Sequence, residues 1–205
     1  MRVGVLAVQG DYAKHVDILK RLGHIPHLVR IEAELNQCDG LIIPGGESTT
    51  LTIVMQKHGL WEPLRRFGER RPIFGTCAGL IILSSRTPNH PFAPLGLIDL
   101  TVERNAYGRQ KDSFIDEVAV TWKGRNHFIP GFFIRAPKII EIGKSVSVLG
   151  RHHNDIVLVE NERILAATFH PELTDDLSVH KYFIRKLSSS RRVAVVAGLT
   201  HSAPG

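Results

Sequence analysis

Apolar residues in the first half of the chain fall into short runs that alternate with segments of helical spacing. The runs 2–8, 25–31 and 41–43 are rich in Val, Ile and Leu, as expected for buried parallel strands. Between the first two runs, the segment 12–22 has apolar residues at helical spacing and ends before a glycine. We therefore predict a doubly wound α/β domain, with a mostly parallel sheet and helices on both of its faces.

The second half has a different pattern, in which short apolar runs are separated by turn residues. A proline-rich stretch, 84–96, comes first and predicts a surface loop. A last helix is expected over 175–187, and the small, apolar tail 188–205 is expected to be mobile, so that the domain spans residues 1–187. The runs between them predict strands of a partly antiparallel extension of the sheet: 97–102, 114–121, 131–134, 145–149 and 155–159.

Composition limits the class of protein. The chain has 205 residues, of which 43% are hydrophobic and 22% charged, and these values are typical of one globular domain in solution. The formal net charge of +6 is spread along the chain, so we do not predict nucleic-acid binding. No apolar run approaches the ~20 residues that span a membrane. A strand begins at once, so no signal peptide is expected, and two cysteines without a disulfide framework suit the reducing cytoplasm.

The segment 71–83 combines a short apolar strand, a tight turn and an apolar helix. Cys77 occupies the turn between Gly75 and Gly79, which is the cysteine counterpart of the Gly-x-Ser-x-Gly nucleophile elbow. A strand that turns directly into a helix strains the corner residue, and the helix N-terminus favours a thiolate there. The N–H of Ala78 is then placed to stabilise an oxyanion. By itself, the motif fits equally well a buried structural cysteine beside two packing glycines.

A second apolar strand, 166–169, ends in His170-Pro171-Glu172. A cysteine nucleophile needs a histidine base, and the histidine in turn needs a group that orients it. We therefore predict a catalytic triad of Cys77, His170 and Glu172, all near strand ends. The alternative is an ordinary histidine at a strand end, followed by an acid that starts a helix.

The stretches 75–79 and 169–172 resemble those of class I (triad) glutamine amidotransferases. Three further stretches, 44–50, 102–110 and 133–137, narrow the resemblance to the glutaminase subunits of pyridoxal 5′-phosphate synthase, over residues 3–187. The resemblance implies a flavodoxin-like domain that hydrolyses L-glutamine to L-glutamate and ammonia through a cysteine thioester. It also implies a hetero-oligomeric complex with a synthase subunit that consumes the ammonia. No metal or organic cofactor is implied.

The same resemblance assigns the remaining site residues. It implies that Gly46 and Ala78 supply the oxyanion N–H groups, and that glutamine contacts Gly46, Glu47, Ser48, Arg104, Ile134 and Arg135. Gln9 and Gly10, at the end of the first strand, could reach the same rim.

Plainer interpretations of these residues stay open. The glycine-rich loop 44–50 lacks the Gly-Lys-Ser/Thr of a phosphate loop, and it could be a turn in which Ser48 or Thr49 caps the next helix. The two arginines could be surface or interface cations.

Two functional alternatives also remain. One is the glutaminase of another amidotransferase, such as that of the histidine pathway, and the other is a non-catalytic α/β protein with a reactive cysteine. We interpret Cys38 as structural and the pair His152-His153 as a solvated turn rather than a metal site, because adjacent residues of a strand rarely point at one ion.

Overall fold

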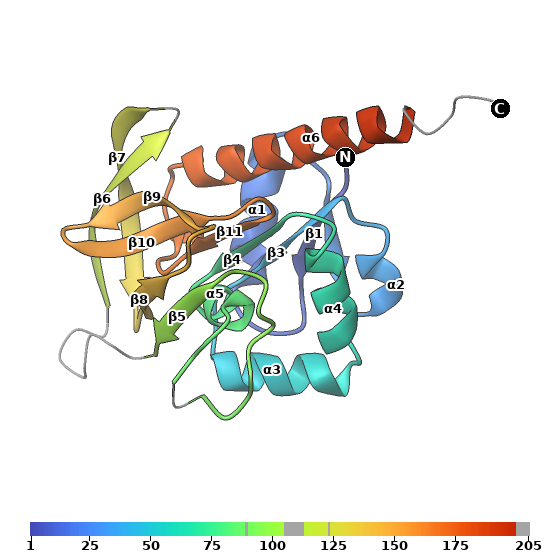
Figure 1. The fold of residues 1–205 in the computed structure, drawn as a ribbon, viewed down its shortest axis with the longest axis horizontal. Helices are drawn as coiled ribbons and strands as arrows, with labels where there is room; N and C mark the ends of the chain where they lie inside the picture. Colours follow the sequence, from blue (N-terminus) through green and yellow to red (C-terminus); the bar gives the residue numbers. More distant parts are fainter. Residues whose placement is uncertain (89, 105–112, 123, 200–205) are drawn as a thin grey trace.

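A nine-stranded mixed sheet runs through the molecule in the computed structural model, which describes residues 1–88, 90–104, 113–122 and 124–199, with side chains up to residue 190. Five neighbouring strands are parallel, in the order β2 (Pro26–Val29), β1 (Val3–Leu6), β3 (Gly40–Ile43), β4 (Ile73–Thr76) and β11 (Ile164–Ala167). Antiparallel strands continue the sheet, in the order β10 (Asp155–Glu160), β9 (Ser147–His152), β6 (Ser113–Trp122) and β7 (Arg125–Ile134) (Figure 1). The predicted doubly wound α/β class with an antiparallel extension is confirmed.

Helices cover both faces of the parallel part (Figure 1). One face carries α1 (Tyr12–Arg21) and α6 (Ser178–Leu199), and the other carries α2 (Glu32–Leu35), α3 (Ser48–Lys57), α4 (Trp61–Gly68) and α5 (Ala78–Leu83). Successive side chains of a strand point to opposite faces. Ile42 and Phe74 therefore pack with the first pair of helices, whereas Ile43 and Ile73 pack with the second group.

Several predicted elements differ from the observed ones. The strand predicted at 97–102 is β5 (Leu100–Glu103), and it does not extend the main sheet, because it pairs with β8 (Lys138–Ile142) in a separate two-stranded sheet. The pattern did not predict β8, α2 or α4. The strand predicted at 131–134 is the end of β7, which already begins at Arg125; its first four residues are exposed and break the apolar pattern.

The last helix, α6, begins and ends later than predicted. It starts at Ser178, whose N–H donates to the Asp176 carboxylate at 2.7 Å. The three serines from Ser188 do not end the helix, because each hydroxyl donates to the carbonyl oxygen four residues earlier. The helix continues to Leu199, so the predicted end at residue 187 is wrong. Residues 200–205 lie outside the described part, and the mobility of the tail stays a prediction.

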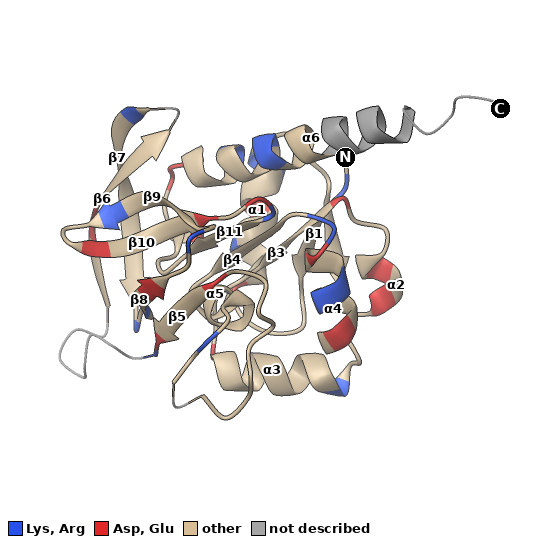
Figure 2. Ribbon diagram, viewed as in Figure 1, with Lys and Arg blue, Asp and Glu red and all other residues tan. Residues whose placement is uncertain are grey.

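Charged residues of both signs are spread over many elements (Figure 2). Within the described ranges, no helix combines the length and the apolar character that a membrane crossing requires.

Candidate active site

Cys77 lies at the corner between β4 and α5. Its backbone has φ 49° and ψ −102°, and its N–H donates to the carbonyl oxygen of Ala167 at 2.8 Å. A positive φ in a residue other than glycine costs about 1–3 kcal/mol and is kept only where the surrounding structure enforces it. The strained corner predicted from the sequence is therefore confirmed. Ala78 is the first residue of α5, so its N–H has no partner within the helix.

The two glycines that flank Cys77 let α5 pack directly on the sheet. A Cβ atom on Gly79 would lie 2.3 Å from the carbonyl oxygen of Ile43, and one on Gly75 would lie 2.7 Å from the carbonyl carbon of Gly79. A side chain at either position would push the helix, and with it the thiol, away from the sheet. The close packing that these glycines allow is therefore also what holds the Cys77 thiol at the corner between β4 and α5.

His170 follows β11 and turns its ring toward Cys77. The backbone N–H of His170 donates to the carbonyl oxygen of Phe132 at 2.7 Å. Its ring atom Nδ1 lies 2.7 Å from Oε1 of Glu172. Only 7% of His170 and 3% of Glu172 are exposed. Burial alone would lower the pKa of His170, but hydrogen bonds to Cys77 and Glu172, together with their charges, raise the pKa to about 10. The site therefore favours the protonated form of the His170 ring beside the Glu172 carboxylate.

Two further buried histidines, which the sequence pattern did not single out, lie behind Glu172. His15 of α1 places Nε2 3.5 Å from Oε1 of Glu172 and 3.4 Å from Oγ1 of Thr76. Its Nδ1 lies 3.0 Å from Nε2 of His180 on α6. Burial raises the pKa of Glu172, but His15 and His170 together hold that pKa well below its usual range. Both histidines lie at buried, inward-facing positions of their helices, and this position in the helical pattern is the sequence feature that could have identified them.

The hydrogen bonds among these groups define where the protons lie. Burial and the neighbouring His15 lower the pKa of His180 to about 3, so His180 is neutral and carries one N–H. Its Nδ1 is buried without a hydrogen-bond partner among the described residues. A buried N–H without a partner is rarer than a buried lone pair without one, so the proton sits on Nε2 and is donated to His15. The other ring nitrogen of His15, Nε2, faces Glu172.

A pocket of about 530 Å³ lies in front of Cys77 and His170. The carbonyl oxygen of Ile134 is 4.0 Å from the Sγ atom of Cys77. The structure brings most of the predicted site residues to this pocket. Besides Cys77 and His170, the predicted residues that line it are Gly46, Glu47, Ser48, Arg104, Ile134 and Arg135, and Gln9 lines it too. Two predicted residues do not line it: Ala78 is buried beneath Cys77, and Glu172 lies behind His170. Asp11 and Leu173 line it as well and were not predicted.

A larger groove, of about 1050 Å³, lies between the β6–β7 hairpin and α6. Trp122, Tyr182 and several charged side chains line it, but none of its described lining residues is a cysteine. The smaller pocket, which holds the strained Cys77 beside His170, is therefore the candidate active site.

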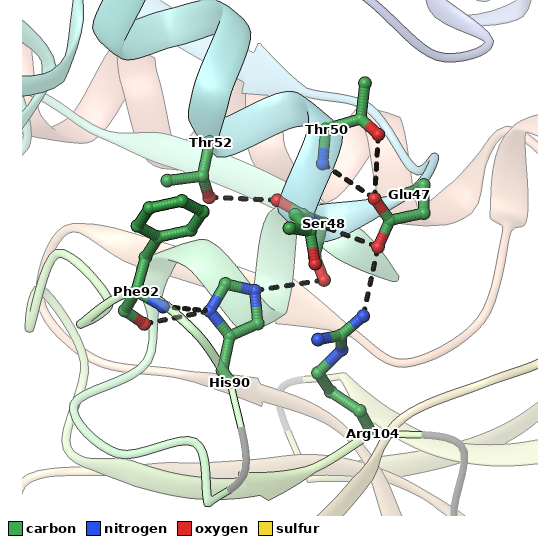
Figure 3. A network of polar contacts seen from close by, with 8 residues as sticks. Glu47, Ser48, Thr50, Thr52, His90, Phe92 and Arg104 are labelled. Atoms are coloured by element: carbon green, nitrogen blue, oxygen red, sulfur yellow. Dashed lines mark hydrogen bonds and ion pairs between the residues drawn. The ribbon is translucent and has the colours of Figure 1, made fainter.

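Glu47 and Arg104 form an ion pair at the edge of the active-site pocket (Figure 3). Nη2 of Arg104 donates to Oε1 of Glu47 at 3.0 Å. The same carboxylate caps α3, because it accepts from the N–H groups of Thr49 at 3.0 Å and Thr50 at 2.6 Å. Burial would raise the pKa of Glu47, but these backbone donors lower it to about 2. The cap of α3 is thus Glu47, and the interpretation of Ser48 or Thr49 as the cap is wrong.

Ser48, the first residue of α3, is held from the proline-rich loop. Its Oγ lies 3.3 Å from Nε2 of His90, and Nδ1 of His90 lies 2.8 Å from the carbonyl oxygen of Phe92 (Figure 3). The loop 84–96 was predicted as surface structure only. It therefore also positions a residue of the pocket.

An elbow cysteine, a buried histidine–glutamate pair and this strand order together define a class I glutamine amidotransferase. The chain belongs to the SNO glutamine amidotransferase family, whose sequence model matches residues 5–189.

Named relatives and solved structures agree with this family. The chain is 49% identical over 185 residues to "Pyridoxal 5'-phosphate synthase subunit PdxT" of Thermotoga petrophila, covering 90% of this chain and 98% of the relative. It is 46% identical over 192 residues to the protein of the same name from Brevibacillus brevis, covering 93% and 100%. A solved structure titled "Crystal structure of glutamine amidotransferase" is 42% identical with a TM-score of 0.85, over 91% of this chain and 98% of that chain. PurLQS from Thermotoga maritima, 18% identical with a TM-score of 0.66, shares the fold over 95% and 98%.

Proposed function

We propose that this chain hydrolyses L-glutamine to L-glutamate and ammonia, and that it delivers the ammonia to a synthase subunit that makes pyridoxal 5′-phosphate. The observation that carries the chemistry is the strained Cys77 beside the buried His170–Glu172 pair, at the floor of a pocket with two arginines on its rim. The names of the relatives at 49% and 46% identity support the synthase as partner, rather than the histidine-pathway enzyme. We place the reaction in the cytoplasm, where a free thiol persists.

In this proposal, Cys77 is the nucleophile and His170 is the acid and base. His170 takes the thiol proton, and the sulfur attacks the side-chain amide carbon of glutamine. The N–H groups of Gly46 and Ala78 bind the resulting oxyanion. The C–N bond breaks as His170 returns a proton to the leaving ammonia, which leaves a γ-glutamyl thioester. Water, deprotonated by His170, then hydrolyses the thioester to glutamate and free thiol.

Glu172 keeps His170 oriented and stabilises its imidazolium form, because Oε1 faces Nδ1 at 2.7 Å. Its pKa lies well below the usual range, so the carboxylate is charged at neutral pH, as this role requires.

The rim supplies groups for the two ends of glutamine. The substrate carboxylate pairs with Arg104 and Arg135 and accepts from the Ser48 hydroxyl. The carbonyl oxygen of Ile134, 4.0 Å from Sγ of Cys77, accepts from the amide NH₂ that becomes ammonia. Glu47 acts mainly by holding Arg104, because its own carboxylate is occupied by the helix cap and the ion pair.

The test is glutamine-dependent synthesis of pyridoxal 5′-phosphate by this chain mixed with a pyridoxal 5′-phosphate synthase subunit. Product formation from glutamine, lost in Cys77→Ser and restored in that variant by added ammonia, is the expected result. The proposal fails if ammonia supports synthesis but glutamine does not, with the wild-type chain folded. Activity with the synthase subunit of the histidine pathway alone would establish the other amidotransferase instead.

A further inference from the structure

A second polar cluster lies outside the active-site pocket, where β9 turns into β10 beside β6. Asp116, His152 and His153 meet there in a pocket of about 500 Å³. The interpretation of both histidines as a solvated turn is wrong for His152, which is only 7% exposed. Nε2 of His152 lies 3.0 Å from Oδ2 of Asp116, and Nε2 of His153 lies 3.7 Å from the same oxygen.

The spacing of these atoms fits a metal ion. One ligand atom from each of the three residues lies within 4.8 Å of the other two. In a tetrahedral zinc site, ligands at about 2.0–2.1 Å from the ion are roughly 3.3 Å apart. The two distances to Asp116 bracket that value. The side chain of His153 is 79% exposed, so it can move toward the other two ligands without disturbing the core.

The surroundings fix the orientation of two ligands in advance. Oδ1 of Asp116 accepts from the N–H of Glu117 at 2.8 Å, which leaves Oδ2 turned toward the histidines. The ring of His152 packs against Phe133 and Phe114, with centroids 4.9 Å and 5.5 Å away. Outer hydrogen bonds such as the one to Asp116 orient ligands in metal sites, and the two aromatic rings limit the rotation of the His152 ring.

The backbone at His153 brings the third ligand to the same place. His153 has φ 50°, a left-handed conformation that turns the chain between β9 and β10 and explains how adjacent histidines reach one oxygen. The objection that neighbours on a strand point to opposite faces therefore does not apply, because His153 lies in the turn and not in β9.

We propose that Asp116, His152 and His153 bind one divalent transition-metal ion, for which Zn²⁺ is the best match, with water in the remaining position. Two imidazoles and one carboxylate suit zinc rather than Mg²⁺ or Ca²⁺, which take mostly oxygen ligands. The ion would join β6 to β9, which pair through Ala119 with Arg151 and Val120 with Gly150. Its role is then to hold the antiparallel extension together, and it is independent of the proposed catalysis.

The experiment is a calorimetric titration of Zn²⁺ into the metal-free full chain. It uses Cys77→Ser as the background, because the active-site thiol and His170 could themselves bind zinc. The expected result is one ion per chain and a thermal midpoint that rises with zinc concentration. His153→Asn and Asp116→Asn should each weaken binding by about tenfold or more, since even outer-shell changes cost about 10–100-fold.

The choice of variants separates a lost ligand from a lost fold. Asparagine tolerates the positive φ at position 153, and Asp116→Asn keeps the side-chain shape. Circular dichroism of the zinc-free variants should match that of the background. His127→Ala removes an exposed histidine of β7 outside the cluster, and it should bind zinc as the background does. Absent binding in the background, or equal affinity in the background and in both ligand variants, would overturn the proposal.

Discussion

Two histidines contact the same carboxylate oxygen, Oε1 of Glu172. Nδ1 of His170 lies 2.7 Å from it, and Nε2 of His15 lies 3.5 Å from it. The second of these is itself held by His180 at 3.0 Å. The carboxylate proposed to orient the base is thus itself held by two buried imidazoles, one on α1 and one on α6. Because all of these groups are buried, each hydrogen bond acts in a low dielectric and is costly to remove.

His15→Leu is expected to lower kcat about tenfold with little change in KM, because a lost hydrogen bond to a charged group costs about 1.5–3 kcal/mol, part of it shared by the remaining donors. His15→Gln, whose amide can still donate, should recover much of the loss. Steady-state kinetics of the complex with its synthase measure both. Equal losses in the two variants would mean that His15 acts through packing alone.

The same variant should alter stability in acid. The pKa of Glu172 is depressed in the folded chain, so its contribution to the free energy of unfolding is complete above the unfolded pKa and is lost as pH falls through the folded pKa. Removing His15 raises the folded pKa of Glu172, so the difference between its folded and unfolded pKa values becomes smaller. The acid-unfolding midpoint of His15→Leu should therefore move to higher pH than that of the wild type, as followed by tryptophan fluorescence. An unchanged midpoint would contradict the assigned interaction.

Cys77→Ser should keep the fold and abolish turnover, because the change is small and the hydroxyl is a far weaker nucleophile. A glutamine-like electrophile should label Cys77 and spare Cys38. Burial raises the pKa of Cys38 to about 11, despite nearby Arg71, so it remains a thiol. Peptide mass spectrometry locates the label. Substantial turnover by the serine variant would refute the nucleophile.

His170→Asn should cost about 10³–10⁴ in kcat, because deprotonation of Cys77 and protonation of the leaving group both disappear. Glu172→Gln should cost less, because the amide can still accept a hydrogen bond from the imidazole although the negative charge is gone. Single-turnover thioester formation is the appropriate measurement. If Glu172→Gln is as inactive as His170→Asn while folded, the division of roles between the two residues is wrong.

The sequence predicted the elements whose pattern is dictated by burial on both sides. The strands that end near Gly46, Cys77 and His170 are continuous apolar runs, and the rule that ligands bind at carboxyl ends of parallel strands then placed those three residues together. Residues 125–130 were missed because five of these six residues are exposed and they form no apolar run, whereas β8 was missed although three of its five residues are isoleucine. Contacts such as His15 with Glu172 join distant segments, and no local pattern reports them.

Arg104→Gln should raise KM for glutamine by about 10–100-fold, in line with the loss of a charge-assisted hydrogen bond, with a smaller effect on kcat. The paired residue Glu47 also caps α3, so Glu47→Gln should add a loss of stability of about 0.5–2 kcal/mol. Arg86→Gln serves as the control, because Arg86 pairs with Asp99 and Glu141 outside the pocket. Similar KM values in Arg104→Gln and Arg86→Gln would remove Arg104 from the substrate site.

The last prediction concerns activity that depends on the partner. The turn after β1 touches the loop that carries the proposed oxyanion N–H: a Cβ on Gly10 would lie 2.0 Å from the carbonyl oxygen of Gly45, and one on Gly46 would lie 2.7 Å from Oε1 of Gln9. Gly46 has φ 153°, which glycine alone adopts readily, and Oε1 of Gln9 is buried without a hydrogen-bond partner in the described ranges. Glycine gives the backbone at this position more conformational freedom than any other residue would.

An oxyanion donor must be aimed within about 0.5 Å to be effective, so the free chain is expected to be a weak glutaminase whose Gly46 peptide is not fixed in the productive orientation. Docking of the synthase on this rim would fix it. Glutaminase turnover at saturating glutamine, with and without the synthase, is the measurement, and a clear rise in kcat is expected. Gly10→Ala should prevent that rise, because its methyl group would displace the Gly45 carbonyl. Equal kcat in the two wild-type assays would eliminate gating and leave the assignment of Cys77, His170 and Glu172 unaffected.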